Sequence, residues 1–221
     1  MMSFPLATLR RALATVHWDV PADGLPTNAI FVANHRSVFD LPIGVEFFRR
    51  HRRSPQVAVH TRYFDRSVAG PLLRLAGAVP TGPGRGSSWL ATALDHLASG
   101  GDVALMPEGR VHMEHGRHPS VGRVYSGAAR LSILSGRPVV PVASVGTADV
   151  WPLGKRFPTF RRHRPQVVLV VGEPVTPCSS PRTTTSAIEA SLNDALRLAH
   201  GRRLWLAPGS DLARRRRLRR E

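Results

Sequence analysis

His35 and Asp40 carry side chains suited to acid–base chemistry, and they lie five positions apart, just after an apolar run. The run, residues 29–33, is short and rich in branched and aromatic side chains, which predicts a buried strand. On one continuous helix, five steps of about 100° would turn the two side chains roughly 140° apart. A strand, a turn and a new helix would instead let the carboxylate fold back onto the imidazole ring.

A carboxylate that accepts from one imidazole nitrogen fixes the tautomer and leaves the other nitrogen free to take a proton. His35 could then act as a general base on an incoming hydroxyl in acyl transfer, with Asp40 as its orienting partner. No serine or cysteine nucleophile is needed if the acceptor alcohol itself attacks. The alternative is a histidine that caps or lines a loop without chemical function.

A second polar cluster, Glu108, Gly109 and Arg110, follows the strand predicted over residues 102–106. Gly109 allows a turn whose N–H groups point at an anion, and Arg110 can make a bidentate contact with a phosphate. Glu108 can orient either of them. The cluster predicts an anion site at the end of a strand.

Three histidines at three-residue spacing raise the alternative of a metal site in a metal-dependent hydrolase. They are His112, His115 and His118. Gly116 and Pro119 break any helix that would place the three on one face, and ring nitrogens on a loop are usually solvated. We therefore expect no metal here.

The order of these blocks resembles the glycerolipid acyltransferases related to 1-acyl-glycerol-3-phosphate acyltransferase. Residues 34–40 resemble the first signature block, Asn-His-x-x-x-x-Asp, and residues 106–110 resemble the third, Phe-Pro-Glu-Gly-Thr-Arg, without its Thr. Residues 138–142 resemble the fourth block. In the second block Gly77 aligns with the family glycine, but Pro83 stands where the arginine belongs, and the nearest candidate is Arg85.

This resemblance implies an α/β fold and transfer of an acyl group from acyl-CoA or acyl carrier protein to a lysophospholipid, with 1-acyl-glycerol-3-phosphate as the expected acceptor. It also implies the residues that carry the reaction. The catalytic residues would be His35 and Asp40, and the substrate-binding residues Asn34, Arg85, Glu108, Gly109 and Arg110. No metal or organic cofactor is implied, because the thioester supplies the activation. The alternatives are another lipid or glycolipid acceptor, or a non-enzymatic, Arg-rich protein that binds nucleic acid.

The composition of the chain indicates its binding partners and its location in the cell. The chain has 221 residues, and 31 Lys plus Arg against 15 Asp plus Glu give a net charge of +16. Such a charge suits phosphate groups on a substrate, an anionic bilayer or nucleic acid, although no nucleic-acid module accompanies it. The single Cys178 excludes an internal disulfide, and no run of about 20 apolar residues could span a membrane. We expect a cytoplasmic protein, peripheral on the inner face of the cell membrane, and leave its oligomeric state open.

The periodicity predicts the elements that must position these residues. One domain is expected over 1–210, with an amphipathic helix near the N-terminus (1–20, helical over 3–18) and a basic tail at 211–221. Further strands are expected at 56–60, 77–81, 102–106, 139–144 and 166–171, and helices at 40–50, 67–75, 87–99 and 122–135, with a last helix opened by the capping box at 186–189. This alternation favours a mixed, largely parallel sheet flanked by helices.

Two stretches allow more than one interpretation. The prolines at 138 and 141 favour an edge position for the strand at 139–144, or a strand that enters a loop. Residues 147–165 mix aromatic side chains with arginines, and could dip into a bilayer interface, cover the active site or be an irregular connection.

Overall fold

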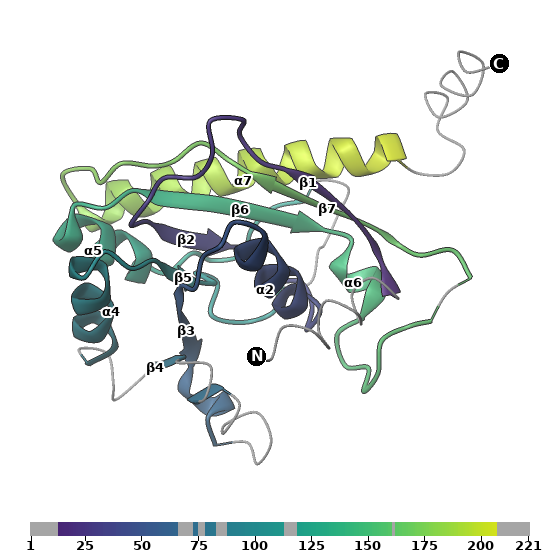
Figure 1. Cartoon of the computed structure of the whole chain (residues 1–221), viewed down its shortest axis with the longest axis horizontal. Helices are drawn as coiled ribbons and strands as arrows, with labels where there is room; N and C mark the ends of the chain where they lie inside the picture. The colour runs from purple at the N-terminus through teal and green to yellow at the C-terminus, as the bar shows by residue number, and fades with distance from the viewer. Residues whose placement is uncertain are drawn as a thin grey trace.

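A seven-stranded sheet organises the described part of the chain, in the order β1-β7-β6-β2-β5-β3-β4 (Figure 1). The computed structural model describes residues 13–65, 73–74, 78–82, 88–112, 119–160 and 162–206. The strands are β1 (Thr15–Asp19), β2 (Ile30–Ala33), β3 (Gln56–His60), β4 (Val79–Thr81), β5 (Val103–Leu105), β6 (Val139–Val145) and β7 (Gln166–Val171). All neighbouring strands are parallel except β6 and β7, so the predicted mixed, largely parallel sheet is confirmed.

Helices cover both faces of the sheet. They are α2 (Asp40–Arg50), the 3-10 turn η1 (Thr61–Tyr63), α4 (Ser88–Ala98), α5 (Gly127–Ser135), α6 (Thr147–Val150) and α7 (Pro181–Leu206). Because successive strand residues point to opposite faces, Phe31 packs with Ile43 and Phe47 of α2, whereas Ile30 and Val32 pack against α4, α5 and α7. The central strand β2 is therefore buried on both sides and holds the polar segment that follows it in a fixed position.

The predicted N-terminal helix is wrong over its last residues. Thr15–Asp19 form β1, an edge strand that pairs in parallel with β7, and residues 1–12 lie outside the described part. The segment TVHWD is rich in β-branched and aromatic side chains, and Trp18 stacks on Phe47 at a centroid distance of 6.5 Å. Tertiary pairing at the sheet edge overrides the helical spacing of the apolar residues.

The edge position predicted for the proline-containing strand is also wrong. β6 lies inside the sheet, between β7 and β2, and all seven of its residues are buried. The antiparallel pairs with β7 begin at Val142, one residue after Pro141, and the Pro141 carbonyl accepts from the Gly172 N–H at 2.9 Å. The missing N–H thus falls where the ladder with β7 begins, which a central strand can accommodate.

The last helix begins earlier than predicted. α7 opens at Pro181, and the Ser180 and Thr183 hydroxyls accept from each other's backbone N–H at 3.2–3.3 Å. This reciprocal capping and a proline at the first helical position explain the start better than the box at 186–189. The predicted inner face is confirmed, since Ile188, Leu192 and Leu196 are fully buried.

The basic cluster at the end of α2 is partly neutralised from within the helix. The side chain of Glu46 is only 1% exposed, and it accepts hydrogen bonds from Arg49 and Arg50 at 2.9–3.1 Å. The hydrogen bond from Arg49 is the main cause that holds the pKa of Glu46 below its ordinary value, although burial acts in the opposite direction. None of the helices in the described ranges has the length and apolar character needed to cross a bilayer.

Candidate active site

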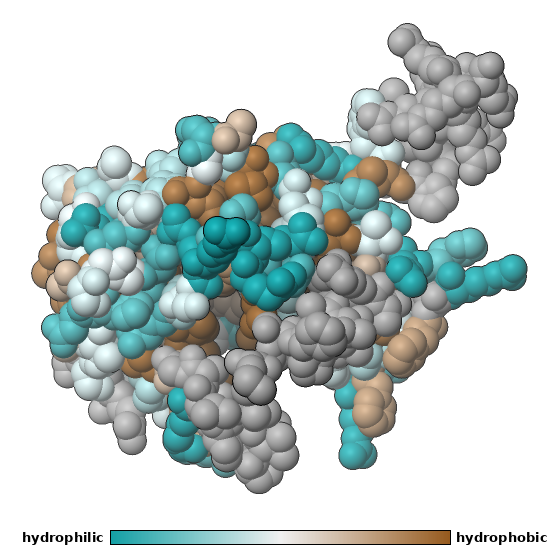
Figure 2. Space-filling view, in the orientation of Figure 1, coloured by the Kyte–Doolittle hydropathy of each residue, from teal (hydrophilic) through white to brown (hydrophobic). Residues whose placement is uncertain are grey.

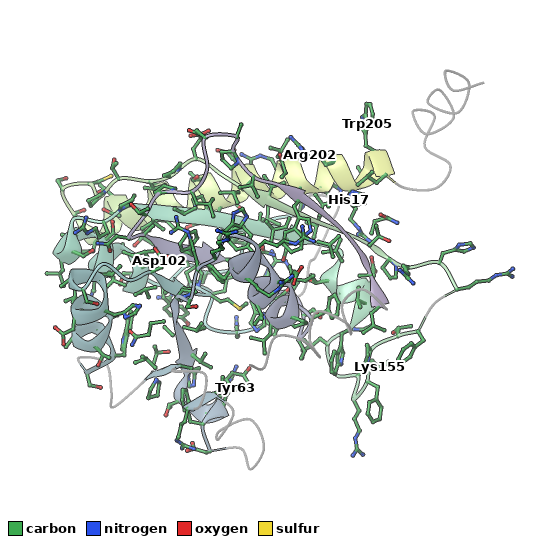
Figure 3. The ribbon with its side chains drawn as sticks, in the orientation of Figure 1. His17, Tyr63, Asp102, Lys155, Arg202 and Trp205 are labelled. Carbon is green, nitrogen blue, oxygen red and sulfur yellow. The ribbon has the colours of Figure 1, made fainter. Side chains whose placement is uncertain are left out.

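The polar segments that follow β2, β5 and β6 meet at one edge of the sheet. β5 and β6 both run parallel to β2, so the carboxyl ends of the three strands lie at the same edge. The opposite edge carries a separate structural network around Asp102, labelled in Figure 3, which accepts from the Ala29 N–H and from Arg53. In open α/β sheets, ligands bind outside the carboxyl ends of the strands. We therefore place the candidate active site at the edge that holds His35.

The predicted contact between His35 and Asp40 is present. The polar turn after β2 reverses the chain, and Nδ1 of His35 lies 2.9 Å from Oδ2 of Asp40. The side chain of His35 is 19% exposed and that of Asp40 is 3% exposed. Among the described residues, nothing bonds to Nε2 of His35. The carboxylate thus fixes the ring from behind and leaves one nitrogen for a substrate.

Asp40 is held by more than the imidazole. Its Oδ2 also accepts from the backbone N–H groups of Arg36 and Ser37, at 2.7 and 2.8 Å, and its Oδ1 lies 3.4 Å from the Ser144 hydroxyl. As the first residue of α2, it also stands where the helix dipole favours a negative charge. An acceptor that satisfies this many donors at once is a fixed carboxylate.

Asn34 connects β2 to β6 just before the His35–Asp40 pair. Its side-chain amide donates to the Ser144 carbonyl at 2.9 Å, and its side-chain oxygen accepts from the Ser144 N–H at 2.7 Å. The residue is fully buried. In this structure the geometry gives Asn34 a positioning part, because its amide bonds to the sheet backbone and has no exposed surface.

Glu108 joins the two polar segments. Its Oε1 accepts from the His35 N–H at 2.9 Å, and its Oε2 accepts from the Gly122 N–H at 2.7 Å. The guanidinium of Arg36 lies 3.2 Å from Oε2, and both side chains are at least 97% buried. Arg36 also donates to the carbonyls of Ser120 and His112. Glu108 is therefore a buried residue that holds together the loops around His35.

An open pocket of about 130 Å³ lies beside Glu108. Its lining residues are Glu108, Arg110, His112, Gly122, Arg123 and Tyr125. Arg110 and Arg123 are exposed, and the Arg123 guanidinium lies 5.2 Å from the centroid of the Tyr125 ring. The backbone of Gly109 has φ +65°, which makes glycine the favoured residue in this turn. The pocket is smaller than the 300–1,000 Å³ typical of ligand sites, so it suits a head group rather than an acyl chain.

Sequence reasoning missed several residues of this edge. Arg36 and Ser37 lie within the predicted block, but their roles depend on contacts with residues far away in sequence, such as the Ser37 hydroxyl to the Trp151 carbonyl at 2.6 Å. Ser144 gave a weak signal as a polar residue inside an apolar strand. Gly122 gave none, although a Cβ there would lie 2.9 Å from Oε2 of Glu108. Arg85 lies outside the described residues.

The structure describes only one of the three histidines in the predicted cluster, His112. His115 and His118 lie outside the described ranges, and His112 donates its backbone N–H to the His35 carbonyl at 2.8 Å. Across those ranges no group of three or more His, Cys, Asp or Glu side chains is arranged to hold a metal ion.

Comparisons with known proteins agree with the geometry. Residues 19–145 match a family described as Acyltransferase, and this stretch contains both polar segments of the candidate site. Among solved structures, the chain is similar to the crystal structure of the 1-acyl-sn-glycerophosphate (LPA) acyltransferase PlsC from Thermotoga maritima. That likeness has a TM-score of 0.59 at 21% identity, covers 82% of this chain and 72% of that chain, and shows a shared fold. The search of curated proteins gave no match.

Proposed function

The chain belongs to the acyltransferase family, and we propose that it esterifies a lysophospholipid with a fatty acyl group from an acyl thioester. The donor is acyl-CoA or acyl carrier protein, and the acceptor is 1-acyl-glycerol-3-phosphate, which gives phosphatidic acid. The related fold of a 1-acyl-sn-glycerophosphate acyltransferase supports this choice of acceptor. The donor and acceptor are both substrates, and the reaction uses no further cofactor.

The proposed reaction is direct transfer without an acyl-enzyme. Nε2 of His35 takes the proton of the acceptor hydroxyl while the hydroxyl oxygen attacks the thioester carbonyl carbon. The tetrahedral intermediate then collapses, the C–S bond breaks, and the departing thiolate receives the proton from His35. Asp40 is a positioning residue, since it holds Nδ1–H and stabilises the imidazolium that forms between the two steps.

One observation carries this proposal: the buried Asp40 bonds to His35 at 2.9 Å, and Nε2 of the ring is left without a bond among the described residues. A histidine that merely lined a loop would not need a carboxylate fixed by two backbone N–H groups. The arrangement is the base and orienter of acyl-transfer enzymes, with the substrate alcohol in place of a protein nucleophile.

We assign the acceptor's phosphate to the pocket beside Glu108. Arg110 and Arg123 supply two cations at its mouth, and guanidinium groups suit bidentate contact with phosphate. Gly109 allows the turn that presents Arg110, and Glu108 fixes the floor of the pocket. Of the three residues in the predicted cluster, Arg110 would contact the phosphate directly, and Glu108 and Gly109 would support it.

The proposed setting is the surface of an anionic membrane, at the inner face of the cell membrane. A lysophospholipid has its acyl chain in the leaflet, so the enzyme must work at that surface. The net charge of +16 favours anionic lipid. The two attachment segments predicted from the sequence, residues 1–12 of the N-terminal helix and the tail at 211–221, lie outside the described residues.

Product identification tests the proposal. Purified protein is incubated with labelled acyl-CoA or acyl carrier protein and with 1-acyl-glycerol-3-phosphate, lysophosphatidylcholine or glycerol 3-phosphate, and the lipids are identified by mass spectrometry. We expect labelled phosphatidic acid to form fastest. Faster acylation of an acceptor without a phosphate monoester would assign the enzyme to another lipid or glycolipid, and no acyl transfer to any acceptor would refute the proposal.

A further inference from the structure

The connection between α6 and β7 has a composition that the proposed reaction does not use. Residues 151–165, here named the Trp151 loop, contain five Lys or Arg residues and no acidic residue. The described part of this loop comprises all its residues except 161. A loop with three aromatic residues and an uncompensated charge of +5 is unusual on a surface that contacts water alone.

The Trp151 loop is pinned at its base. The Thr159 N–H donates to the Val150 carbonyl at 2.8 Å, and the indole N–H of Trp151 donates to the Lys155 carbonyl at 2.9 Å. The Trp151 ring also packs against the core cluster that contains α2. The loop therefore presents its outer side chains from a fixed base.

Large apolar side chains project from this base. Leu153 is 46% exposed, Phe157 is 69% exposed and Phe160 is 77% exposed. Figure 2 shows tan side chains beside teal ones on the segment that projects at the lower right, and Figure 3 marks Lys155 on the same segment. Apolar side chains exposed next to cations are typical of elements that enter the headgroup region of a bilayer.

The cations of the loop have no acidic partners in the described residues. Lys155, Arg156, Arg162 and Arg164 make no ion pair there, whereas Arg202 and Arg203 of the nearby α7 pair with Asp19 and Asp149. Arg156 lies 5.5 Å from the centroid of the Phe157 ring, so a cation and an apolar ring share one position. The surface is thus complementary to anionic groups above an apolar layer.

The loop lies at the same edge of the sheet as His35. β6 runs parallel to β2, Ala33 pairs with Val142, and β6 continues to Val145 before α6 leads into the loop. The hydroxyl of Ser37, two residues from His35, donates to the Trp151 carbonyl at 2.6 Å. A surface that held the Trp151 loop would therefore meet the edge where the candidate base lies.

We propose that the Trp151 loop docks the protein on an anionic lipid leaflet, with Leu153, Phe157 and Phe160 in the headgroup layer and the loop cations on lipid phosphates. Nucleic acid offers phosphates too, but it has no apolar layer for an exposed leucine. The loop is separate in sequence from the predicted N-terminal helix and basic tail. It would hold the membrane next to the candidate active site.

Vesicle flotation tests this inference with the full chain. The vesicles are phosphatidylcholine alone or mixed with phosphatidylglycerol, and the variants are Phe157→Ser/Phe160→Ser and Lys155→Ser/Arg156→Ser. Each cation close to an anionic surface strengthens partitioning onto the vesicle about fivefold, so loss of two cations should weaken binding to the mixed vesicles roughly 25-fold. Loss of the two exposed rings should weaken it by at least about tenfold. All four side chains are solvent-exposed, so thermal unfolding should be unchanged.

Matched controls come from α5 and the turn that follows it, and α5 lies at the other end of the molecule in Figure 1. Leu134→Ser removes an apolar side chain that is 61% exposed, and Arg130→Ser/Arg137→Ser removes the same charge from an exposed surface. Both controls should keep at least half of the wild-type binding. Equal losses in the loop and control variants would overturn the inference, because attraction would then be a property of net charge.

Two further outcomes distinguish lipid binding by the loop from nucleic-acid binding and from the proposed enzymatic function. If the loop variants keep vesicle binding but lose binding to a single-stranded oligonucleotide, the surface is a nucleic-acid contact and the lipid inference is overturned. The inference rests on the proposed function for its purpose, but flotation needs neither substrate nor turnover. A protein that floats through this loop and transfers no acyl group would refute the proposed function and support the lipid contact.

Discussion

Glu108→Gln separates a positioning role for Glu108 from the direct substrate contact that the sequence suggested. The carboxylate accepts from the His35 and Gly122 N–H groups and pairs with Arg36, and its side chain is 1% exposed. Glutamine keeps the shape but removes the charge and turns one of the two acceptor oxygens into a donor. We expect lower stability and slower turnover together, because the same contacts hold the loops and the backbone of His35.

The magnitude follows from the buried pair. Removing one partner of a buried ion pair costs about 3–5 kcal/mol, and glutamine retains one acceptor, so we expect about 3 kcal/mol. With an m-value of about 2 kcal/mol per molar urea, the unfolding midpoint should fall by roughly 1.5 M. Because Arg36 is the cation that pairs with Glu108, the two side chains should be coupled, and Glu108→Gln should cost about 1–2 kcal/mol less when Arg36 is already methionine.

Urea unfolding of the wild type, both single variants and the double variant measures this coupling. Glu173→Gln is the matched control, since Glu173 is exposed and makes no ion pair among the described residues, and it should change stability by less than about 0.5 kcal/mol. Unchanged stability of Glu108→Gln with a raised KM for the acceptor would refute the reasoning and return Glu108 to direct substrate binding.

Arg110, Gly122 and Glu46 carry the remaining predictions. Arg110→Ala should raise the KM of the acceptor roughly tenfold or more and leave the KM of the donor unchanged. The control Arg130→Ala, at an exposed residue, should change neither KM. Equal effects on both substrates would show that the phosphate binds elsewhere. Gly122→Ala should cost about 1–3 kcal/mol in urea unfolding, because its Cβ would lie 2.9 Å from the Glu108 carboxylate; full stability would show that the loop can shift. Glu46 has a pKa below its ordinary value of 4.5, so its contribution is present above that pH and is lost as the pH falls through the folded-state pKa. Glu46→Gln should therefore cost about 1 kcal/mol at pH 7 and progressively less below pH 4.5, and a pH-independent difference would contradict this.

The sheet could be predicted because its strands are apolar runs bounded by polar residues. Burial of a strand on both faces leaves a continuous apolar pattern, as in residues 29–33, and strands that alternate with helices indicate parallel pairing. β1 could not be predicted in the same way, since an edge strand keeps one side open and its spacing also fits a helix. The central place of β6 depends on where its proline falls relative to β7, which the sequence alone does not contain.

The His35–Asp40 contact could be predicted because both residues belong to one short segment. The roles of Arg36 and Ser144 could not, because each depends on a partner about 70 to 110 positions away, Glu108 for the first and Asn34 for the second. An arginine beside the candidate base looks like a solvated cation in the sequence, and its burial becomes visible when the two loops meet.

The most direct test of the proposed function is the single-turnover rate of acyl transfer by His35→Ala, measured at saturating acyl-CoA and 1-acyl-glycerol-3-phosphate. Loss of a general base should slow the chemical step by about 10²- to 10⁴-fold, with stability unchanged to within about 1 kcal/mol. His200→Ala is the control, since the His200 side chain on α7 makes no hydrogen bond among the described residues. This variant should turn over at the wild-type rate. A folded His35→Ala protein that transfers the acyl group at a near-normal rate would contradict the central claim.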